Sequence, residues 1–435
     1  MNISILTVFE ELYEPFLRTS LVRHAQDKGI VNIDVDTFFS FVPAKKRIDA
    51  PTFGPGSGML IRPEVVEKAI DAQEKKYGKA FRIFFSPHGE KLNQQSLARL
   101  AEHVQKQGHL MLVPARYEGM DARVEEEYAD AIVSIGDFVL MGGDMPAMIL
   151  LEGLLRLIPG VVGKEQSVEE ESFSGPFVDY PSYTEPIEWH GKSVPEVVRS
   201  GNHAAIEAWR TQQAAQRTVQ NHFAWMRSQH MTDGQRSLVR TIIPSHYVAL
   251  MHSDVLIGDN RAPGTTSVTS IDIHDIARSS STYDIKNFFI VTPLLDQQKI
   301  VRTLLDFWKK GVGIDYNPGR HKAVSCVELT DSLDEVIAAI EQKEGKKPLL
   351  VATSARDTNH AQQISFWDQS KVWHHDRPVL FIFGTGKGLT PELMARCDYV
   401  LLPVHGLSDF RHLSVRSAVA IILDRWLGLN EKIYR

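Results

Sequence analysis

Short apolar segments alternate with amphipathic segments along the chain. In the first half, apolar runs of strand length cover residues 3–9, 33–39, 81–86, 109–114 and 131–141. Segments 63–76, 94–107 and 146–158 instead repeat apolar residues every three or four positions, which is the spacing of a helix. Strands that alternate with helices predict an α/β fold, with a mainly parallel sheet covered by helices.

The alternation stops and then starts again. Residues 161–186 are polar and loop-like, and residues 201–230 are polar and helix-prone. Beyond them, strands are expected at 247–254, 287–293, 323–329, 348–354, 379–384 and 399–404, and helices at 296–310, 332–343, 390–397 and 414–428. We therefore predict an α/β domain over residues 1–165, an interdomain loop and helical region over 166–244, and a second α/β domain over 245–435.

Length and composition agree with two domains. A chain of 435 residues exceeds one typical core, and 43% hydrophobic with 23% charged residues is ordinary for a globular protein. The two cysteines, Cys326 and Cys397, cannot build a disulfide framework, which suits a reducing compartment. With no signal-peptide pattern and no long apolar run, we expect a cytoplasmic chain without membrane partners.

The net charge of −6 argues weakly against a nonspecific nucleic-acid coat. It leaves RNA binding open, because phosphates respond to local basic clusters such as Lys45-Lys46-Arg47 and not to the average charge. DNA is not an expected partner.

Glycine-containing loops follow several predicted strands of the first half. They are GPGSG at 54–58, SPHG at 86–89, RYEG at 116–119 and the stretch SIGDFVLMGGDMPAM at 134–148. Ligands of open α/β sheets bind at the carboxyl ends of strands, so these loops can converge on one pocket. The chain has neither a GxxxxGK[ST] phosphate loop nor a GxGxxG dinucleotide motif. The loops fit an uncharged adenine and ribose recognised by backbone groups; ordinary turns are the alternative.

The first half closely resembles bacterial tRNA (guanine-N1)-methyltransferases. The resemblance is carried by SIGDFVLMGGDMPAM together with SPHGEKLNQ, ARYEGMDARV, YPSYTEP and SGNHAAIEAWR, and it runs in order from residue 1 to about 217. The resemblance implies the SPOUT superfamily fold, in which the sheet is threaded into a trefoil knot, and a homodimer. It also implies S-adenosyl-L-methionine as methyl donor, magnesium dependence, and tRNA as substrate. The expected target is the guanosine immediately 3′ of the anticodon.

The resemblance implies donor-binding residues position by position. They are Ser86, Pro87, Ala115, Tyr117, Glu118, Gly119, Ser134, Ile135, Gly136, Asp137, Phe138, Val139, Leu140, Gly142, Gly143 and Pro146. The family usually has Cys-Gly where this chain has Pro114-Ala115, so a backbone contact made at the glycine must here tolerate a β-carbon.

Two residues are expected to carry the chemistry. Methylation of guanine N1 needs a base for the N1 proton and a cation for the charge that gathers on O6. By resemblance these are Glu171, before Ser-Phe, and Arg156. The family has Asp at the position of Glu171, whose arm is longer by one methylene, about 1.5 Å. A solvated acidic loop is the alternative for residues 169–171. No metal-ligand spacing is visible.

Residues of the middle region could hold the tRNA. Phe173, Tyr180 and Tyr183 could stack on unpaired bases, although packing within the protein is an equal alternative. Lys164 and the helical segment with Arg210 and Arg217 are candidate phosphate contacts.

The second half repeats the plan of strand, glycine loop and helix in FIFGTGKGLTPEL at 381–393. With TTSVTSIDIHDIARSSSTYDI and LLVATSAR, residues 245–429 are similar to an RNA methyltransferase domain of the SPOUT type. Candidate donor contacts are Thr353, Ser354, Gly384, Gly386, Leu402, Pro403, Leu413 and Ser414. His274 and Asp275 suggest a metal ligand or a base, but helix capping by Asp272 is the commoner explanation. Arg278 or Arg416 could contact the target nucleotide.

The leading hypothesis is a tRNA guanine-N1 methyltransferase fused to a second methyltransferase domain of unknown target. An RNA-binding scaffold that has lost chemistry in one half is an alternative, supported by Ala115, Glu171 and the acidic net charge. A nicotinamide-dependent oxidoreductase is disfavoured because the dinucleotide motif is missing.

Overall fold

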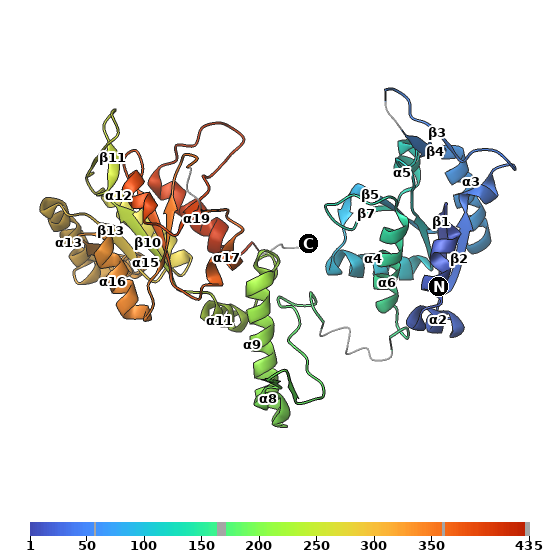
Figure 1. Ribbon diagram of the computed structural model, residues 1–435, viewed down its shortest axis with the longest axis horizontal. Helices are drawn as coiled ribbons and strands as arrows, with labels where there is room; N and C mark the ends of the chain where they lie inside the picture. The colour runs from blue at the N-terminus through green and yellow to red at the C-terminus, as the bar shows by residue number, and fades with distance from the viewer. Residues whose placement is uncertain (56–57, 163–170, 359–361, 431–435) are drawn as a thin grey trace. The chain divides into compact units, whose positions relative to one another are not determined.

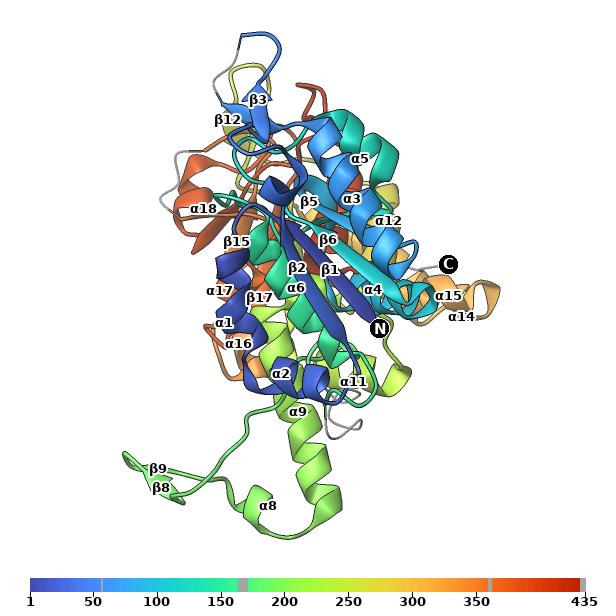
Figure 2. The same cartoon turned by 90° about the vertical axis from the view of Figure 1, so that its right-hand side faces the viewer.

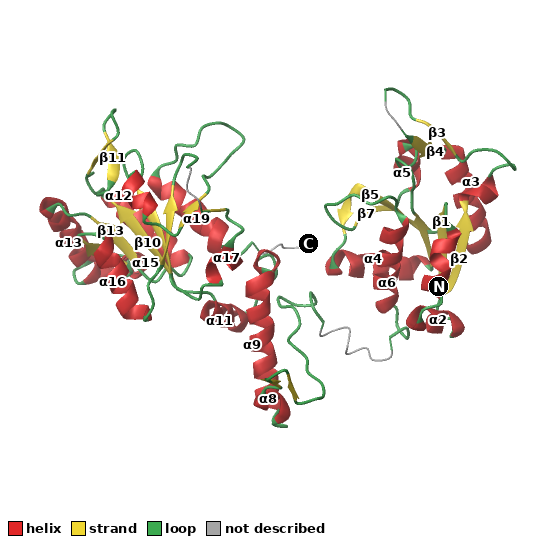
Figure 3. Ribbon diagram, in the orientation of Figure 1, coloured by secondary structure: helices red, strands yellow, loops and turns green. Residues whose placement is uncertain are grey.

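The computed structural model describes residues 1–55, 58–162, 171–358 and 362–430. The chain forms two compact units, Met1–Ser174 and Gly175–Arg435 (Figure 1). Each unit is an α/β structure built on a parallel sheet, with helices beside the strands (Figure 3). The prediction of an α/β fold with parallel sheets is therefore confirmed.

The first unit contains a five-stranded parallel sheet in the order β2-β1-β6-β5-β7. Its strands are β1 (Asn2–Thr7), β2 (Asn32–Thr37), β5 (Phe81–Lys91), β6 (His109–Val113) and β7 (Ala131–Ser134), and a small hairpin is formed by β3 (Asp49–Pro51) and β4 (Met59–Ile61). Its helices are α1 (Tyr13–Leu17), α2 (Ser20–Asp27), α3 (Pro63–Tyr77), α4 (Gln94–Gln107), α5 (Ala122–Tyr128) and α6 (Asp144–Arg156), with 3-10 turns at Glu10–Leu12 and Phe38–Phe41.

Alternation along the strands divides the apolar core of this unit into two layers. Leu110 and Leu112 of β6 pack with α2, α4 and α6, whereas Met111 and Val113 pack with α3 and α5. Because successive strand residues point to opposite faces, both faces of the sheet are buried. The continuous apolar runs in the sequence have this physical origin.

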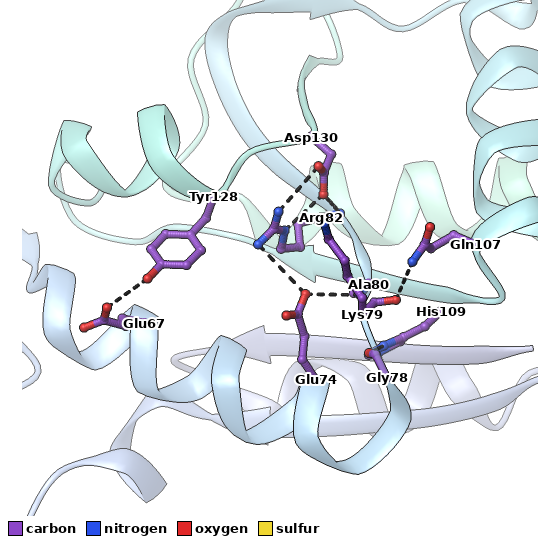
Figure 4. A network of polar contacts seen from close by, with 10 residues as sticks. All are labelled: Glu67, Glu74, Gly78, Lys79, Ala80, Arg82, Gln107, His109, Tyr128 and Asp130. Atoms are coloured by element: carbon purple, nitrogen blue, oxygen red, sulfur yellow. Dashed lines mark hydrogen bonds and ion pairs between the residues drawn. The ribbon is translucent and has the colours of Figure 1, made fainter.

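A polar network fixes the edge of this sheet at which β5 and β6 begin (Figure 4). The Arg82 guanidinium donates to Asp130 over 3.0 Å and lies 3.9 Å from Glu74, which also accepts from the amide of Ala80. The His109 ring contacts the carbonyl of Gly78 at 2.7 Å. These bonds tie the loop before β5 to neighbouring elements at the edge opposite to the strand exits.

The second unit contains a seven-stranded parallel sheet in the order β14-β13-β10-β17-β15-β18-β16. Its strands are β10 (His246–Met251), β13 (Phe288–Val291), β14 (Val327–Thr330), β15 (Leu349–Thr353), β16 (Gln363–Ile364), β17 (Val379–Gly384) and β18 (Tyr399–Leu401). Two hairpins accompany it, β8 (Glu188–Trp189) with β9 (Lys192–Ser193) and β11 (Val255–Ile257) with β12 (Ala262–Gly264).

The helices of this unit vary in length, and the longest one described has 19 residues. They are α8 (Glu196–Arg199), α9 (His203–Asn221), α10 (Phe223–Met226), α11 (Asp233–Ile242), α12 (Ser270–Thr282), α13 (Leu295–Lys309), α14 (Gly313–Tyr316), α15 (Pro318–Val324), α16 (Leu333–Glu344), α17 (Gln369–Trp373), α18 (Pro391–Ala395) and α19 (Val415–Leu427). The carboxyl end of α9 and α10 enter the core through Val219, Phe223 and Met226. Within this unit, the amino end of α9 extends away from the sheet together with α8 and the β8–β9 hairpin (Figure 2).

Two predicted strands differ from the structure. The run 131–141 was expected to be one strand, but β7 ends at Ser134, and Gly136 follows with a φ of +156° that side-chain-bearing residues rarely adopt. Ala323 and Val324 close helix α15 instead of starting a strand. Both segments are apolar, and an apolar run by itself does not distinguish a strand from a loop or the end of a helix. None of the helices in the described residues is long and apolar enough to cross a membrane.

A histidine lies at the centre of the second core. The indole N–H groups of Trp373 and Trp426 both donate to His246 Nε2, over 3.2 and 3.0 Å, and His246 Nδ1 contacts the carbonyl of Pro244 at 2.7 Å. This pattern requires an unprotonated Nε2, hence a neutral ring. Burial lowers the pKa of His246 to about 4, and nearby Lys286 acts in the same direction.

The second unit should therefore lose stability in mild acid. Between about pH 6.5 and about pH 4 the unfolded chain binds a proton on this histidine that the native chain does not bind, so the free energy of unfolding falls as the pH falls, by up to about 1.4 kcal/mol per pH unit. His252 is also buried and its pKa is also lowered to about 4, so its protonation in the unfolded chain lowers the free energy of unfolding further as the pH falls. Urea unfolding followed by tryptophan fluorescence at pH 7.5 and 5.0 measures the difference. His246→Gln should have a smaller difference, and an unchanged one would contradict this assignment.

Candidate active sites

Loops of the first unit gather where its parallel strands end. The segment that follows β6 and the segment that follows β7 meet in an isolated bridge between Arg116 and Gly142. The amide of Gly143 also donates to the carbonyl of Ala115 over 2.7 Å. Segments predicted from separate motifs thus form one contiguous backbone surface.

The two glycines are required by the closeness of these segments. A β-carbon on Gly142 would lie 2.4 Å from Cδ of Arg116, and one on Gly143 would lie 3.0 Å from the amide nitrogen of Ala115. A β-carbon at position 142 would therefore displace the Arg116 side chain, and one at position 143 would press on the backbone of residues 114–115. The methyl group of Ala115 packs in the core with α3 and α5, so the β-carbon that departs from the family pattern is accommodated away from this contact.

A buried carboxylate holds the loops in place. Asp144, the first residue of α6, accepts from Thr7 over 2.6 Å, from the hydroxyl of Tyr13 over 3.0 Å and from Nε of Arg116 over 2.6 Å. Only 1% of its side chain is exposed. Burial raises the pKa of Tyr13, and the neighbouring Asp144 charge adds to this effect. Sequence reasoning missed Asp144, although an acid directly after two glycines at a helix start could have identified it.

The remaining predicted donor contacts occupy the same edge of the sheet. Tyr117 has a φ of +60°, and the amide of Glu118 donates to Met59 over 3.1 Å. The Ser134 hydroxyl accepts from the amide of Gly136 over 3.4 Å. Ser86 begins the bulge in β5, where its hydroxyl contacts His88 at 2.6 Å. Phe138, Val139 and Leu140 are exposed, Asp137 pairs with Lys91, and Pro146 is buried in α6.

The two expected catalytic groups are in direct contact. One guanidinium nitrogen of Arg156, the last residue of α6, bonds both carboxylate oxygens of Glu171. The side chains are 45% and 37% exposed, so solutes can reach the pair. Lys164, a candidate phosphate contact, lies outside the described residues, as do Glu169 and Glu170.

The second unit has a cavity of about 800 Å³ at the exit edge of its sheet. Its wall includes almost all the predicted donor contacts of this half, namely Thr353, Ser354, Gly384, Gly386, Leu402, Leu413 and Ser414. A β-carbon on Gly386, which has a φ of +59°, would lie 2.8 Å from the carbonyl of Leu256. The amide of Lys387 donates to that carbonyl over 2.8 Å. The close approach of a glycine loop to a neighbouring segment therefore recurs here.

Residues that were not predicted as donor contacts complete the wall. Thr266 and Thr385 both line the cavity, and their hydroxyl oxygens are 2.5 Å apart. Behind them, Nδ1 of buried His252 contacts Thr266 at 3.0 Å. Asp272 and Arg416 also line the cavity, whereas Arg278 is exposed on α12. Nδ1 of His274 is buried without a hydrogen bond, and its ring packs against Trp308.

Among the described residues, no three His, Cys, Asp or Glu side chains lie close enough together to hold a metal ion.

Comparisons with known proteins match both units. The model of a family described as "tRNA (Guanine-1)-methyltransferase TrmD" matches residues 1–227, and that of a family described as "SAM-dependent RNA methyltransferase" matches residues 245–428. Proteins named tRNA (guanine-N(1)-)-methyltransferase from Nitratidesulfovibrio vulgaris and Oleidesulfovibrio alaskensis are 36% and 35% identical, over 98% of this chain and 99% of each relative. The Bacillus subtilis protein of that name is 37% identical over 55% of this chain and 98% of its own length.

Removal of the Asp144 carboxylate should destabilise the first unit. Asp144→Ala leaves Arg116, Thr7 and Tyr13 without their shared acceptor, and the loss of one partner from a buried ion pair costs about 3 kcal/mol or more. Denaturant unfolding of the full chain measures the loss. The matched control Asp71→Ala removes an exposed carboxylate from α3 and should leave the unfolding curve unchanged. Equal curves for the two variants would refute the structural role of Asp144.

Proposed function

The chain belongs to the tRNA (guanine-N1)-methyltransferase family, and from that premise we propose which of its residues bind the methyl donor and which transfer the proton. It methylates guanine N1 of tRNA, and it carries a second, S-adenosylmethionine-dependent RNA methyltransferase domain. The proposed target of the first site is the guanosine immediately 3′ of the anticodon. The observation that carries the assignment is the contact between Arg156 and Glu171 at the end of the helix that begins in the glycine loop.

Residues 115–119 and 134–143, with Ser86 and Pro87, are proposed to bind the donor in the first unit. The proposal is supported by the close contact of Gly142 with the Arg116 side chain and of Gly143 with the backbone of residues 114–115, because a β-carbon at either position would crowd these groups. Such a surface offers peptide N–H and C=O groups to adenine and ribose without a charged side chain. A cosubstrate without phosphate requires no lysine in these loops. The trefoil knot is part of the same proposal, supported by the contact between the segments that follow β6 and β7.

Glu171 is proposed as the base and Arg156 as the cation. Guanine presents N1–H next to O6, so a carboxylate can accept the proton while a guanidinium donates to the oxygen on which charge gathers. The two side chains contact each other directly, so one substrate edge can replace their mutual bond with one contact to each. When bound, S-adenosylmethionine supplies the electrophilic methyl group. The longer arm of Glu171 brings its carboxylate to Arg156, which supports Glu as a working replacement for Asp.

The cavity of the second unit is proposed as a second donor site. Loops after β15, β17 and β18 contribute Ser354, Gly386 and Leu402 to its wall. Its volume of about 800 Å³ falls within the range of small-molecule pockets. Position 386 has a positive φ and lies close to the carbonyl of Leu256, so it requires glycine. This loop can therefore offer backbone groups to a donor, as proposed for the first unit.

The middle region is proposed to contact tRNA. Arg210 on α9 lies 4.6 Å from the ring of Tyr180, and Tyr183 lies 6.2 Å from Trp209. Arginine beside aromatic rings suits phosphate binding together with base stacking. Arg217 is also exposed on α9. We place this activity in the cytoplasm.

A homodimer is proposed through the first unit. Met145 and Ile149, one turn apart on α6, are 46% and 50% exposed, and Val139 and Met141, in the loop that leads into α6, are 88% and 89% exposed. Exposed apolar residues that gather in this way mark an interaction surface. A second copy of the chain is the proposed occupant, because such a contact would order the adjoining donor loop.

Loss of the carboxylate at position 171 should abolish the first activity. Glu171→Gln should lower methyl transfer to a tRNA transcript with a guanosine 3′ of the anticodon by about a hundredfold or more, which is the usual contribution of a general base. Its affinity for S-adenosylhomocysteine, measured by calorimetry, should stay near normal. Glu126→Gln, which changes an exposed glutamate on α5, is the matched control and should retain full turnover. Full turnover by Glu171→Gln would mean that another group is the base.

Charges on the exposed face of α6 should separate the dimer. The double variant Met145→Glu with Ile149→Glu should reduce the mass measured by light scattering from two chains to one, because carboxylates would have to be buried in the contact. Leu21→Glu alters an apolar residue on α2 that is 51% exposed and should remain dimeric. A wild-type mass of one chain would contradict the proposal.

A further inference from the structure

A carboxylate and a guanidinium also meet inside the cavity of the second unit. Asp272, in the first turn of α12, and Arg416, in the first turn of α19, both line it. Oδ1 of Asp272 lies 3.3 Å from Nε of Arg416, and the other carboxylate oxygen accepts from the hydroxyl of Thr269. The pair comes from helices whose starts are far apart in the sequence but adjacent at the exit edge of the sheet.

The position of Arg416 is unusual. A cation in the first turn of a helix opposes the positive end of the helix dipole, so local helix energetics do not favour it. Two carboxylates compensate: Asp272 from the cavity wall and Asp275, whose Oδ2 lies 3.3 Å from Nη1 of Arg416. Asp275 is not part of the cavity wall, and its side chain is 50% exposed, compared with 15% for Asp272. Asp272 is thus the carboxylate that faces the proposed donor space.

We propose that Asp272 is the base and Arg416 the charge-stabilising group of a second methyl transfer, and that the acceptor is a lactam ring nitrogen of an RNA base. This rests on the proposed donor site in the cavity. A lactam edge, as in guanine or uracil, has an N–H next to a carbonyl oxygen. The Asp272 carboxylate can accept from this N–H while the adjacent Arg416 guanidinium donates to the carbonyl oxygen. A ribose hydroxyl has no neighbouring carbonyl to take up the charge, so Arg416 would have no such role in its methylation.

The step balances without a further reactant. The N–H proton passes to a carboxylate oxygen of Asp272 while negative charge spreads to the carbonyl oxygen beside Arg416. The ring nitrogen forms the N–C bond to the methyl carbon supplied by the donor as the C–S bond breaks, and the electron pair of that bond stays on sulfur. Asp272 then releases the proton to solvent.

The test uses the full chain and RNA that lacks the modification. Total RNA from a strain whose own gene carries Asp272→Asn is incubated with purified wild-type chain and methyl-labelled S-adenosylmethionine, then digested to nucleosides for mass spectrometry. A parallel reaction uses Glu171→Gln chain, whose proposed first site is inactive and whose second site is intact, and label that appears in both reactions reports the second site. We expect label on a lactam ring nitrogen, as in 1-methylguanosine or 3-methyluridine. Label on a ribose oxygen, an exocyclic amine or carbon, or no label, would overturn the proposal.

Two isosteric variants separate catalysis from packing. Asp272→Asn should lower this transfer by about a hundredfold or more, whereas Asp275→Asn, which alters the other partner of Arg416, should stay within about threefold of wild type. An equal loss in both variants would show that the carboxylates only position Arg416.

Calorimetry with S-adenosylhomocysteine supplies a readout independent of turnover. Wild type, Asp272→Asn and Asp275→Asn should each bind two molecules per chain. A donor site lost only in Asp272→Asn would make Asp272 a donor ligand and would refute its role as base. A single site in the wild type would instead refute the proposed second donor site itself, so the two failures are distinguishable.

Discussion

The closeness of two loops at the exit edge of a parallel sheet is the constraint on which the first site depends. Gly142 lies against the Arg116 side chain and Gly143 against the backbone of residues 114–115, so that a β-carbon at either position would crowd the contact. Asp144 follows at once and binds Arg116, Thr7 and Tyr13, which ties the start of α6 to both loops and to β1. The direction of α6 then places Arg156 at its far end, beside Glu171. The proposed donor-binding loops and the proposed catalytic pair therefore lie at opposite ends of one helix.

The second unit reaches a similar arrangement with different residues. Gly386 approaches the carbonyl of Leu256, and the polar groups beneath the loop are Thr385, Thr266 and His252 in place of a buried carboxylate. Its carboxylate–guanidinium pair, Asp272 with Arg416, lies on the cavity wall. A carboxylate–guanidinium pair in each unit suits the two methyl transfers to RNA that we propose.

Much of this could be predicted from the sequence, because buried parallel strands are continuous apolar runs and their exit loops carry glycines. All the residues predicted around the proposed second donor site except Pro403 line one cavity, although they were inferred from separate motifs. The backbone conformation within an apolar run was harder to predict. Residues 135–141 were predicted as strand because Phe138, Val139 and Leu140 are apolar, yet these side chains are exposed in a loop. Asp144 and His252 were missed, and Asp272 was named only as a helix cap, because their other contacts involve partners distant in the sequence. No local pattern marks such contacts.

A crystal of the full chain soaked with S-adenosylhomocysteine tests the central claim most directly, namely that both sheets bind the donor at their exit edges. We predict density for the ligand against residues 115–119 and 134–143 in the first unit, and within the cavity bounded by Thr353, Gly386 and Leu413 in the second. Ligand bound elsewhere, or either pocket empty at saturating ligand, would contradict the account.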